Sequence, residues 1–121
     1  MDNNKYYKDG QLKESRSYKN NLRHGQWINY YKNGQIHYKQ SYIDDKLHGK
    51  KVSYYQDGTI AFEGSFNFGK RNGHWIYYSN KGKIVKNILY KNGKLESSWK
   101  NILFQYYYAL WLVEAYLLFS I

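Results

Sequence analysis

The chain has 121 residues, no cysteine and no proline, and a formal net charge of +10 from 19 lysines and arginines against 9 aspartates and glutamates. This composition excludes disulfides, cysteine metal sites and cysteine nucleophiles, and the positive charge either favours anionic partners or serves solubility alone. Sixteen tyrosines and ten glycines are typical of an all-β chain with many short turns.

The N-terminal residues 1–5 are polar and lack the apolar stretch of a secretory signal. A chain without cysteine also suits a reducing compartment. We therefore expect a cytoplasmic protein, with membrane association left open by the apolar C-terminal segment described below.

From residue 6 onward the sequence repeats itself every 24 residues. One column of glycines consists of Gly10, Gly34, Gly58 and Gly82, and a second consists of Gly25, Gly49 and Gly73. Each period holds two strand-like runs, such as residues 26–31 and 36–42, and in the second of these apolar and polar residues alternate. Alternation of this kind predicts strands with one buried face.

The connections between these runs are of two kinds. The Asn-Gly and Asp-Gly pairs predict type I′ hairpin turns, in which both central residues have positive φ. These pairs are Asp9-Gly10, Asn33-Gly34 and Asp57-Gly58. The fourth copy has Lys81 before its glycine, so we expect a looser turn there. The other connection, for example residues 19–25, is expected to be a longer loop.

Stacked hairpins can bury an apolar face that a single hairpin cannot. The sequence therefore predicts an all-β fold over residues 1–99, an elongated antiparallel sheet of about four stacked hairpin repeats. The expected core consists of the constant apolar columns, which are Leu12, Ile36, Ile60 and Ile84; Tyr18, Tyr42, Phe66 and Tyr90; Ile28, Val52 and Ile76; and Tyr30, Tyr54 and Tyr78.

Residues 30–36, Tyr-Tyr-Lys-Asn-Gly-Gln-Ile, followed by Tyr42 and then by His48-Gly49, resemble the bacterial variant of the MORN repeat (membrane occupation and recognition nexus). Residues 90–95 are similar to one half of that pattern. The resemblance covers roughly residues 5–99 and implies a non-catalytic scaffold for protein or lipid contact; many bacterial members carry the label of antitoxin component. The chain departs from the pattern at Lys51, where neighbouring copies have tryptophan, and at Ser97, where they have glycine.

No residues in the sequence have the spacing of a catalytic or metal site. His24 and His48 are one repeat apart, and equivalent positions on neighbouring hairpins lie two strand spacings apart, roughly 9–10 Å, which is too far to ligate one ion. The nine carboxylates show no paired acid and base. We expect no enzyme, no metal and no cofactor.

Two sets of residues are candidates for partner contact. Trp27 and Trp75 lie on the strand face opposite Ile28 and Ile76, so that they are either exposed for binding or a second packing layer. The second set is basic and is expected to line one edge of the array as a ridge: Arg23, Lys46, Lys50, Lys51, Lys70, Arg71 and Lys94. A ridge of this kind either binds anions or is a solvated edge that resists aggregation.

These observations predict a non-catalytic repeat scaffold that binds a protein partner, and the resemblance implies an antitoxin-like or immunity-like role. The alternative is a basic module that binds anionic lipid headgroups or nucleic acid. The two classes differ in salt dependence, because binding to phosphates weakens steeply as salt rises.

Residues 102–121 break the repeat with an apolar run that only Gln105, Glu114 and Ser120 interrupt. A run of about 20 apolar residues is long enough to span a bilayer as a helix, so the segment from residue 100 onward is a membrane anchor in one interpretation. In a second, non-native sequence follows a shortened array. In the third, which we favour, a helix caps the open end of the sheet. The expected contacts of this cap are Ile84, Ile88, Leu89 and Tyr90.

Overall fold

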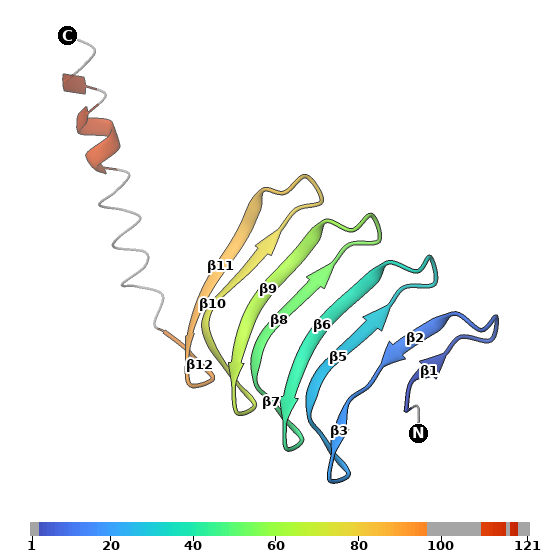
Figure 1. The fold of residues 1–121 in the computed structure, drawn as a ribbon. Coiled ribbons are helices and arrows are strands. Elements are labelled where there is room, and N and C mark those ends of the chain that lie inside the picture. Colours follow the sequence, from blue (N-terminus) through green and yellow to red (C-terminus); the bar gives the residue numbers. More distant parts are fainter. Residues whose placement is uncertain (1–2, 97–109, 116, 119–121) are drawn as a thin grey trace.

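The computed structural model describes residues 3–96, 110–115 and 117–118. These residues form a ten-stranded antiparallel sheet and a separate two-stranded sheet. Figure 1 shows hairpin after hairpin side by side in chain order, making one long curved sheet. The predicted fold class is confirmed.

The strands follow the 24-residue period. In chain order they are β1 (Lys5–Tyr6), β2 (Leu12–Ser15), β3 (Tyr18–Lys19), β4 (Leu22–Arg23), β5 (Gly25–Tyr30), β6 (Ile36–Ile43), β7 (Lys46–Leu47), β8 (Gly49–Tyr54), β9 (Ile60–Asn67), β10 (Lys70–Tyr78), β11 (Ile84–Lys91) and β12 (Lys94–Leu95). The large sheet has the order β1-β2-β5-β6-β8-β9-β10-β11-β12, with β7 paired to β6, and β3 pairs with β4.

The Asn-Gly turns are not of the predicted type. Gly34 donates its N–H to the Tyr31 carbonyl at 3.0 Å, and Tyr31 donates to the Gln35 carbonyl at 2.8 Å. Gly34 has a φ of 85°, whereas Asn33 is not among the residues of positive φ. This geometry is a three-residue loop, a type I turn followed by one left-handed residue, so the type I′ prediction is wrong. The Asn33 carboxamide oxygen instead accepts the Gln35 N–H at 3.0 Å.

The fourth of these turns is as tightly bonded as the others. Gly82 donates its N–H to the Ser79 carbonyl at 2.9 Å, as the turn glycines of the earlier copies do. The Ser79 hydroxyl accepts the N–H groups of Lys81 at 3.3 Å and Lys83 at 3.2 Å, in place of the Asn or Asp side chain. The expectation of a looser turn is therefore wrong, because Ser79 replaces the missing acceptor.

Type I′ turns occur at the opposite ends of the hairpins, where longer loops were expected. In each of these turns both central residues have positive φ: Asn20 and Asn21, Asp44 and Asp45, Phe68 and Gly69, and Asn92 and Gly93. The flanking residues pair directly, as Lys19 does with Leu22. The expected long loops are two-residue turns. Asn, Asp and Gly tolerate the left-handed conformation, and Phe68 is the one central residue of these four turns that is none of the three.

The second glycine column produces a bulge that lays tryptophan onto the sheet. Gly73 has a φ of 81°, and the pairing of β9 with β10 passes from Asn72–Ser65 to Ile76–Glu63. Two extra residues therefore lie on β10, and the bulge frees the Ser65 carbonyl. The Trp75 indole N–H donates to that carbonyl at 3.2 Å.

The core lies on one face of the sheet, which we call the Trp face. Cross-strand pairing places Trp27 opposite Gln40 and Lys51 opposite Gly64 on this face. Trp75 is 1% exposed, Tyr42 7% and Trp27 9%. The predicted isoleucine column is less buried, since Ile60 and Ile84 are exposed. The core prediction is therefore correct for Tyr42 and wrong for Ile60 and Ile84, and also for Tyr18, which is exposed.

Tyrosine hydroxyls join each repeat to the next, and we call these bonds the tyrosine clasps. The hydroxyl of Tyr7 donates to the Tyr30 carbonyl at 2.7 Å. Tyr31 donates to Tyr54 at 2.8 Å, and Tyr55 donates to Tyr78 at 2.6 Å. The fourth copy has Ser79 at this position, so the series of tyrosines ends there.

A second set of bonds joins the type I′ turns to the preceding repeat. The N–H of the second turn residue donates to a carbonyl 22 positions earlier in the chain: Asp45 to Arg23 at 2.9 Å, Gly69 to Leu47 at 2.7 Å, and Gly93 to Arg71 at 2.8 Å. Both ends of each hairpin are thus held against a neighbour. The array is stabilised repeat by repeat, as in other proteins of stacked units.

The C-terminal helix does not cover the last hairpin in the part that the structure describes. Residues 110–115 and 117–118 are helical, and most of their large apolar side chains are exposed. Ile84 and Val85 of β11 are 61% and 65% exposed, and Figure 1 shows the helix apart from the sheet. The predicted cap is therefore absent among these residues. The boundary expected at residues 99–100 lies outside the described residues.

Among the described residues, no helix has the length and apolar character that crossing a bilayer requires.

Candidate functional site

Trp27 and Trp75 are part of the core and are not available to a partner. Both are buried, and their indole N–H groups donate to the backbone carbonyls of Ser17, at 2.9 Å, and Ser65. The interpretation of these two residues as contact sites is wrong. Of the two alternatives that the sequence left open for Trp27 and Trp75, exposure or packing, packing is correct. The two rings pack against the sheet on the Trp face.

Aromatic rings surround the two tryptophans in separate clusters. Trp27 makes edge contacts with Tyr18 and Tyr42, with ring centroids 5.4 Å and 5.2 Å apart. Trp75 has more neighbours: Phe62 at 6.0 Å, Phe66 at 5.0 Å and Tyr90 at 6.3 Å. Lys51 occupies the tryptophan position of the repeat between the two clusters.

Cationic side chains lie over these rings across the whole Trp face. The pairs, each with the distance from the cation to the ring centroid, are Arg16 with Trp27 at 5.3 Å, Arg23 with Tyr42 at 4.5 Å, Lys51 with Tyr38 at 5.0 Å and with Phe62 at 6.0 Å, Arg71 with Trp75 at 4.6 Å and with Tyr90 at 5.4 Å, and Lys86 with Tyr77 at 5.9 Å. Contacts of this geometry are attractive and hold the cation in place.

The two cations at the N-terminal end have acidic partners. Arg16 pairs with Glu14 at 3.0 Å, and Arg23 pairs with Asp45 at 3.0 Å. The Arg23 backbone N–H also donates to Asp45, and together these hydrogen bonds hold the pKa of Asp45 below its usual value. The positive charge at this end of the face is therefore largely neutralised within the chain.

The two cations at the centre of the face have no such partner among the described residues. Neither Lys51 nor Arg71 forms an ion pair there, although Arg71 donates to the Tyr90 hydroxyl at 3.0 Å. Partial burial, and then the positive charge of Arg71, lower the pKa of Lys51. Two like charges thus act on each other beside the rings of Phe62 and Trp75.

The predicted basic ridge does not exist as one surface. Lys50 lies on the opposite face from Lys51, because neighbouring strand residues alternate, and it approaches Glu63 at 3.9 Å. Arg23, Lys51 and Arg71 lie on the Trp face. The remaining three, Lys46, Lys70 and Lys94, follow successive type I′ turns, and we call them the lysine edge. The ridge prediction is wrong because it placed adjacent residues of a strand on one side.

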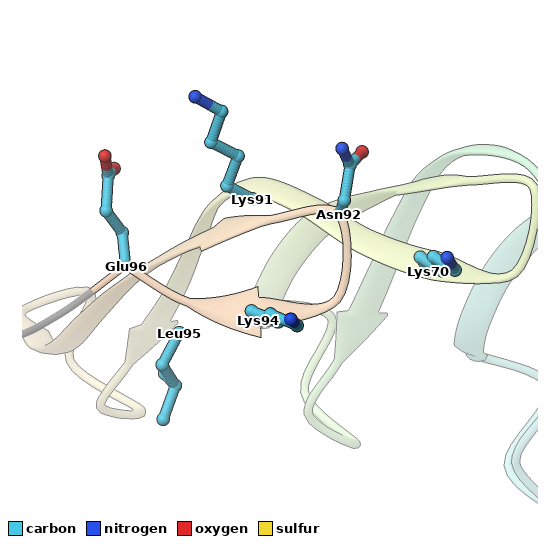
Figure 2. A pocket seen from close by; sticks show the side chains of 6 residues that line it. All are labelled: Lys70, Lys91, Asn92, Lys94, Leu95 and Glu96. Carbon is cyan, nitrogen blue, oxygen red and sulfur yellow. The ribbon is translucent and has the colours of Figure 1, made fainter.

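The lysine edge includes one open hollow. A space of about 630 Å³ beside the last turn is lined by Lys70, Lys91, Asn92, Lys94, Leu95 and Glu96. Figure 2 shows that Lys91, Asn92 and Glu96 point to one side of the hairpin and Leu95 to the other. Its polar groups do not converge on one point, so the hollow offers positive charge without a defined site for a small ligand.

Each histidine contacts one neighbouring group. The Phe68 N–H donates to His48 Nδ1 at 3.2 Å, and His24 lies 3.4 Å from the Asp44 carboxylate in the type I′ turn of the next repeat. His37 and His74 lie within hydrogen-bonding distance of the carboxamide oxygens of Asn29 and Asn87, at 3.3 Å and 2.9 Å. Within residues 3–96, 110–115 and 117–118, no three His, Asp or Glu side chains lie close enough together to hold a metal ion.

The sequence reasoning missed several residues of the face, namely Arg16, Tyr38, Phe62, Tyr77 and Lys86. Side chains alternate between the two faces along each strand, so these residues could have been placed on the Trp face once one tryptophan had been assigned to it. The strands concerned are β2, β6, β9, β10 and β11. Each is separated by an even number of strand positions from a residue of the core.

The family comparisons cover most of this sheet. Residues 4–20 and 71–92 match the MORN repeat variant family. Residues 18–71, between them, match the family described as the N-terminal region of the histone H3 K4-specific methyltransferase SET7. The same hairpin unit runs through all three segments. The matches support a MORN-repeat protein.

MORN repeats are generally non-catalytic modules, and they commonly mediate contact with proteins or membrane lipids. The match to the SET7 family is a likeness to one region of a methyltransferase, over 18–71 only. No curated protein matches the chain. The MORN-type hairpins therefore support a repeat scaffold and name no partner.

Proposed function

We propose that this chain is a non-catalytic scaffold that binds a protein partner through the Trp face, around Lys51 and between the two ring clusters. The observation that carries the proposal is the set of cations held over rings on a single face of a regular sheet. Arginine and tyrosine are enriched where interfaces gain most of their energy. A partner would meet half-buried rings and positioned charges there.

The sheet itself suits this role because it is held rigid at both ends of its hairpins. The tyrosine clasps and the type I′ turns fix each repeat against the next. Groups that are already positioned lose little freedom on binding, which favours affinity. The stacked repeats thus present an extended surface of fixed shape.

A finer form of the proposal is that the partner is a toxin and that the chain acts as its antitoxin or immunity protein in the cytoplasm. The support for this form is the resemblance to the bacterial MORN variant. The net charge of +10 favours an acidic partner, because like charges across an interface repel.

Site-specific photo-crosslinking tests the proposed face. We expect benzoylphenylalanine at Tyr77, on the Trp face, to crosslink a protein from the native cell extract. The matched probe at Lys50, on the opposite face, is expected to give no adduct. Adducts from position 50 alone, or from neither position, would contradict the proposal.

A second candidate function is the binding of anionic phosphates by the lysine edge. The observation in its favour is the open hollow that Lys70, Lys91 and Lys94 line. Juxtaposed lysines attract anionic lipid surfaces by about 1 kcal/mol each, and such binding is screened by salt.

Vesicle sedimentation separates this second candidate from the first. If the lysine edge binds phosphates, vesicles with phosphatidylserine should retain the protein at low salt and release it near physiological salt. Replacement of Lys70, Lys91 and Lys94 by Gln should abolish the retention. Equal retention by neutral vesicles would contradict this function.

A further inference from the structure

Two arginines occupy the same position of the repeat, two periods apart, and only one of them has an acidic partner. Arg23 lies 4.5 Å from the ring centroid of Tyr42, and Arg71 lies 5.4 Å from that of Tyr90. Arg23 pairs with Asp45 at 3.0 Å, whereas Arg71 forms no ion pair in the part of the chain that the structure describes. The charge of the second arginine is therefore not neutralised there.

The first arginine shows how this position of the repeat binds a carboxylate. Oδ1 of Asp45 accepts the Arg23 backbone N–H at 2.8 Å and the Nε–H at 3.0 Å. The Asp45 carbonyl accepts the Nη2–H of Arg23 at 3.1 Å, and the Asp45 N–H donates to the Arg23 carbonyl at 2.9 Å. The aspartate that makes these bonds is the second residue of a type I′ turn.

The second arginine faces the same turn without the acidic side chain. Gly93 takes the place that Asp45 has, and its N–H donates to the Arg71 carbonyl at 2.8 Å. In the repeat between them the same backbone bond joins Gly69 to Leu47 at 2.7 Å, so both the acid and the arginine are absent. Among these three described turns, only that of Gly93 faces an arginine and lacks an acid.

The Arg71 side chain is exposed to solvent and already held in position. Its guanidinium lies 4.6 Å from the ring centroid of Trp75, and its Nη1 donates to the Tyr90 hydroxyl at 3.0 Å. A guanidinium has five N–H donors, and this bond uses one of them. Because the group is positioned before a ligand arrives, the ordering cost on binding is low.

An apolar side chain lies beside this group. Leu95 pairs with Tyr90 across the strands, so the two side chains are on the same face of the sheet. Leu95 is 64% exposed. A ligand at Arg71 therefore meets a charged group with an apolar contact next to it.

We propose that Arg71 is the receptor for one carboxylate, supplied by an aspartate or glutamate of the protein partner, in the place that Asp45 has at Arg23. This inference rests on the proposed function and names the chemistry of the partner. Guanidinium and carboxylate groups form charge-assisted hydrogen bonds, frequently two in parallel. Leu95 gives apolar contact to a residue that neighbours the acid in the partner.

A membrane or a nucleic acid fits this site less well. Such partners present many phosphates over a wide area and contact many cations at once. Arg71 offers one guanidinium that lies over two rings, and its counterpart Arg23 holds a carboxylate. A single acidic side chain is the matching ligand.

A carboxylate supplied by the chain itself tests the geometry. A Cβ at Gly93 would lie 3.5 Å from the Lys70 Cβ, an ordinary contact, and Asp45 shows that aspartate adopts the positive φ of this turn. We expect Gly93→Asp to melt at a higher temperature than Gly93→Asn at about pH 6, and the difference to disappear at about pH 2.5, where the carboxylate is protonated. Equal melting at about pH 6 would overturn the inference.

Peptide selection tests the receptor on the intact chain. A phage-displayed library of twelve-residue peptides is selected on the wild-type protein, and the Kd of enriched peptides is measured. We expect enriched peptides to share an aspartate or glutamate, and replacement of that residue by its amide to weaken binding about tenfold or more, which corresponds to about 1.4 kcal/mol. Arg71→Gln should weaken the acidic peptide to the same extent.

Gly93→Asp should also weaken the acidic peptide about tenfold or more, because its own carboxylate occupies Arg71. The amide peptide should bind Gly93→Asp and the wild type equally. The matched control is Gly69→Asp, which adds the same charge at the equivalent turn, where Leu47 takes the place of the arginine. Gly69→Asp should leave the Kd within about twofold. Circular dichroism shows whether each variant is folded, and if Arg71→Gln fails to fold, Gly93→Asp decides the outcome.

The outcomes separate the inference from the proposed function. Enriched peptides that need Tyr77 but lack an acidic residue, or that bind Gly93→Asp normally, overturn the carboxylate receptor and leave the binding face in place. Enrichment of no peptide overturns the inference, and crosslinking at Tyr77 then decides the proposed function. Binding of phosphatidylserine vesicles that is lost in Gly93→Asp, with peptide binding unchanged, would assign the arginine to a lipid headgroup and overturn the inference.

Discussion

The same position of the repeat is packed differently in the two halves of the sheet. Trp75 is 1% exposed and lies flat on Gly64, where an added Cβ would lie 2.2 Å from the indole ring. Trp27 is 9% exposed, and Arg16 takes the place that Gly64 has, eleven positions before the tryptophan. The Arg16 guanidinium lies over the Trp27 ring, 5.3 Å from its centroid.

The difference shows that the preceding strand decides how deeply a repeated residue is buried. A glycine eleven positions before the tryptophan lets the ring reach the backbone of that strand, whereas the Arg16 side chain keeps the ring of Trp27 further out. The 24-residue period fixes where a tryptophan occurs and leaves its packing to a residue on the neighbouring strand.

The largest expected effect comes from removing the two tryptophans. Trp75→Ala should lower the free energy of unfolding by about 3–5 kcal/mol, because a fully buried ring with three ring neighbours is lost. Trp27→Ala should lower the free energy of unfolding by less, about 3 kcal/mol, because this ring has fewer ring neighbours. Urea denaturation followed by circular dichroism measures both. An equal loss from the two variants would contradict the comparison.

The next effect tests the role of Gly64. Gly64→Ala should destabilise by about 1–3 kcal/mol, because the new methyl group overlaps the indole of Trp75. In a chain that already has Trp75→Ala, the same substitution should cost little. A double-mutant cycle measures this coupling. If the cost is unchanged without the indole, the packing explanation fails.

A smaller effect is expected from the tyrosine clasps. Tyr7→Phe, next to the Trp27 repeat, and Tyr55→Phe, next to the Trp75 repeat, each remove one hydrogen bond and should cost about 0.5–1.5 kcal/mol. Tyr54→Phe is the control, because its hydroxyl makes no hydrogen bond within the described part of the chain. Thermal melting of the three variants gives the comparison, and a Tyr54→Phe loss as large as the others would argue against the clasps.

The smallest effect concerns pH and the first half of the sheet alone. Hydrogen bonds from Arg23 lower the pKa of Asp45 in the folded state, so this carboxylate stabilises the fold above its unfolded value of 3.8. The contribution is lost as pH falls through the lowered pKa. Asp45→Asn should therefore reduce stability at about pH 6 and much less at about pH 2.5. Equal differences at both pH values would exclude the ion pair as the cause.

The sequence was sufficient to predict the hairpin repeat, because glycine columns and alternating strands have a direct local cause. It was not sufficient to assign the turns, since Asn33-Gly34 suits both a type I′ turn and a three-residue loop. Local propensity cannot choose between these, whereas cross-strand register does. Residues 44–45 were read as a longer loop for the same reason.

The candidate site was predicted only in part. Alternation shows that Trp27 and Ile28 face opposite sides, but it does not show which side is covered. The answer depends on Gly64 and Gly73, whose effects appear only when neighbouring strands are paired. Lys50 and Lys51 were grouped by sequence proximity, although a strand sends adjacent side chains to opposite faces.

The clasps between repeats give the array a direction. In each tyrosine clasp the earlier repeat supplies the hydroxyl and the later repeat supplies the carbonyl, as Tyr31 does for Tyr54. A chain leaves the ribosome from its N-terminus, so each finished hairpin already presents a donor to the one being made. The sheet can therefore lengthen in the order of its synthesis, with every new hairpin settling on a completed template.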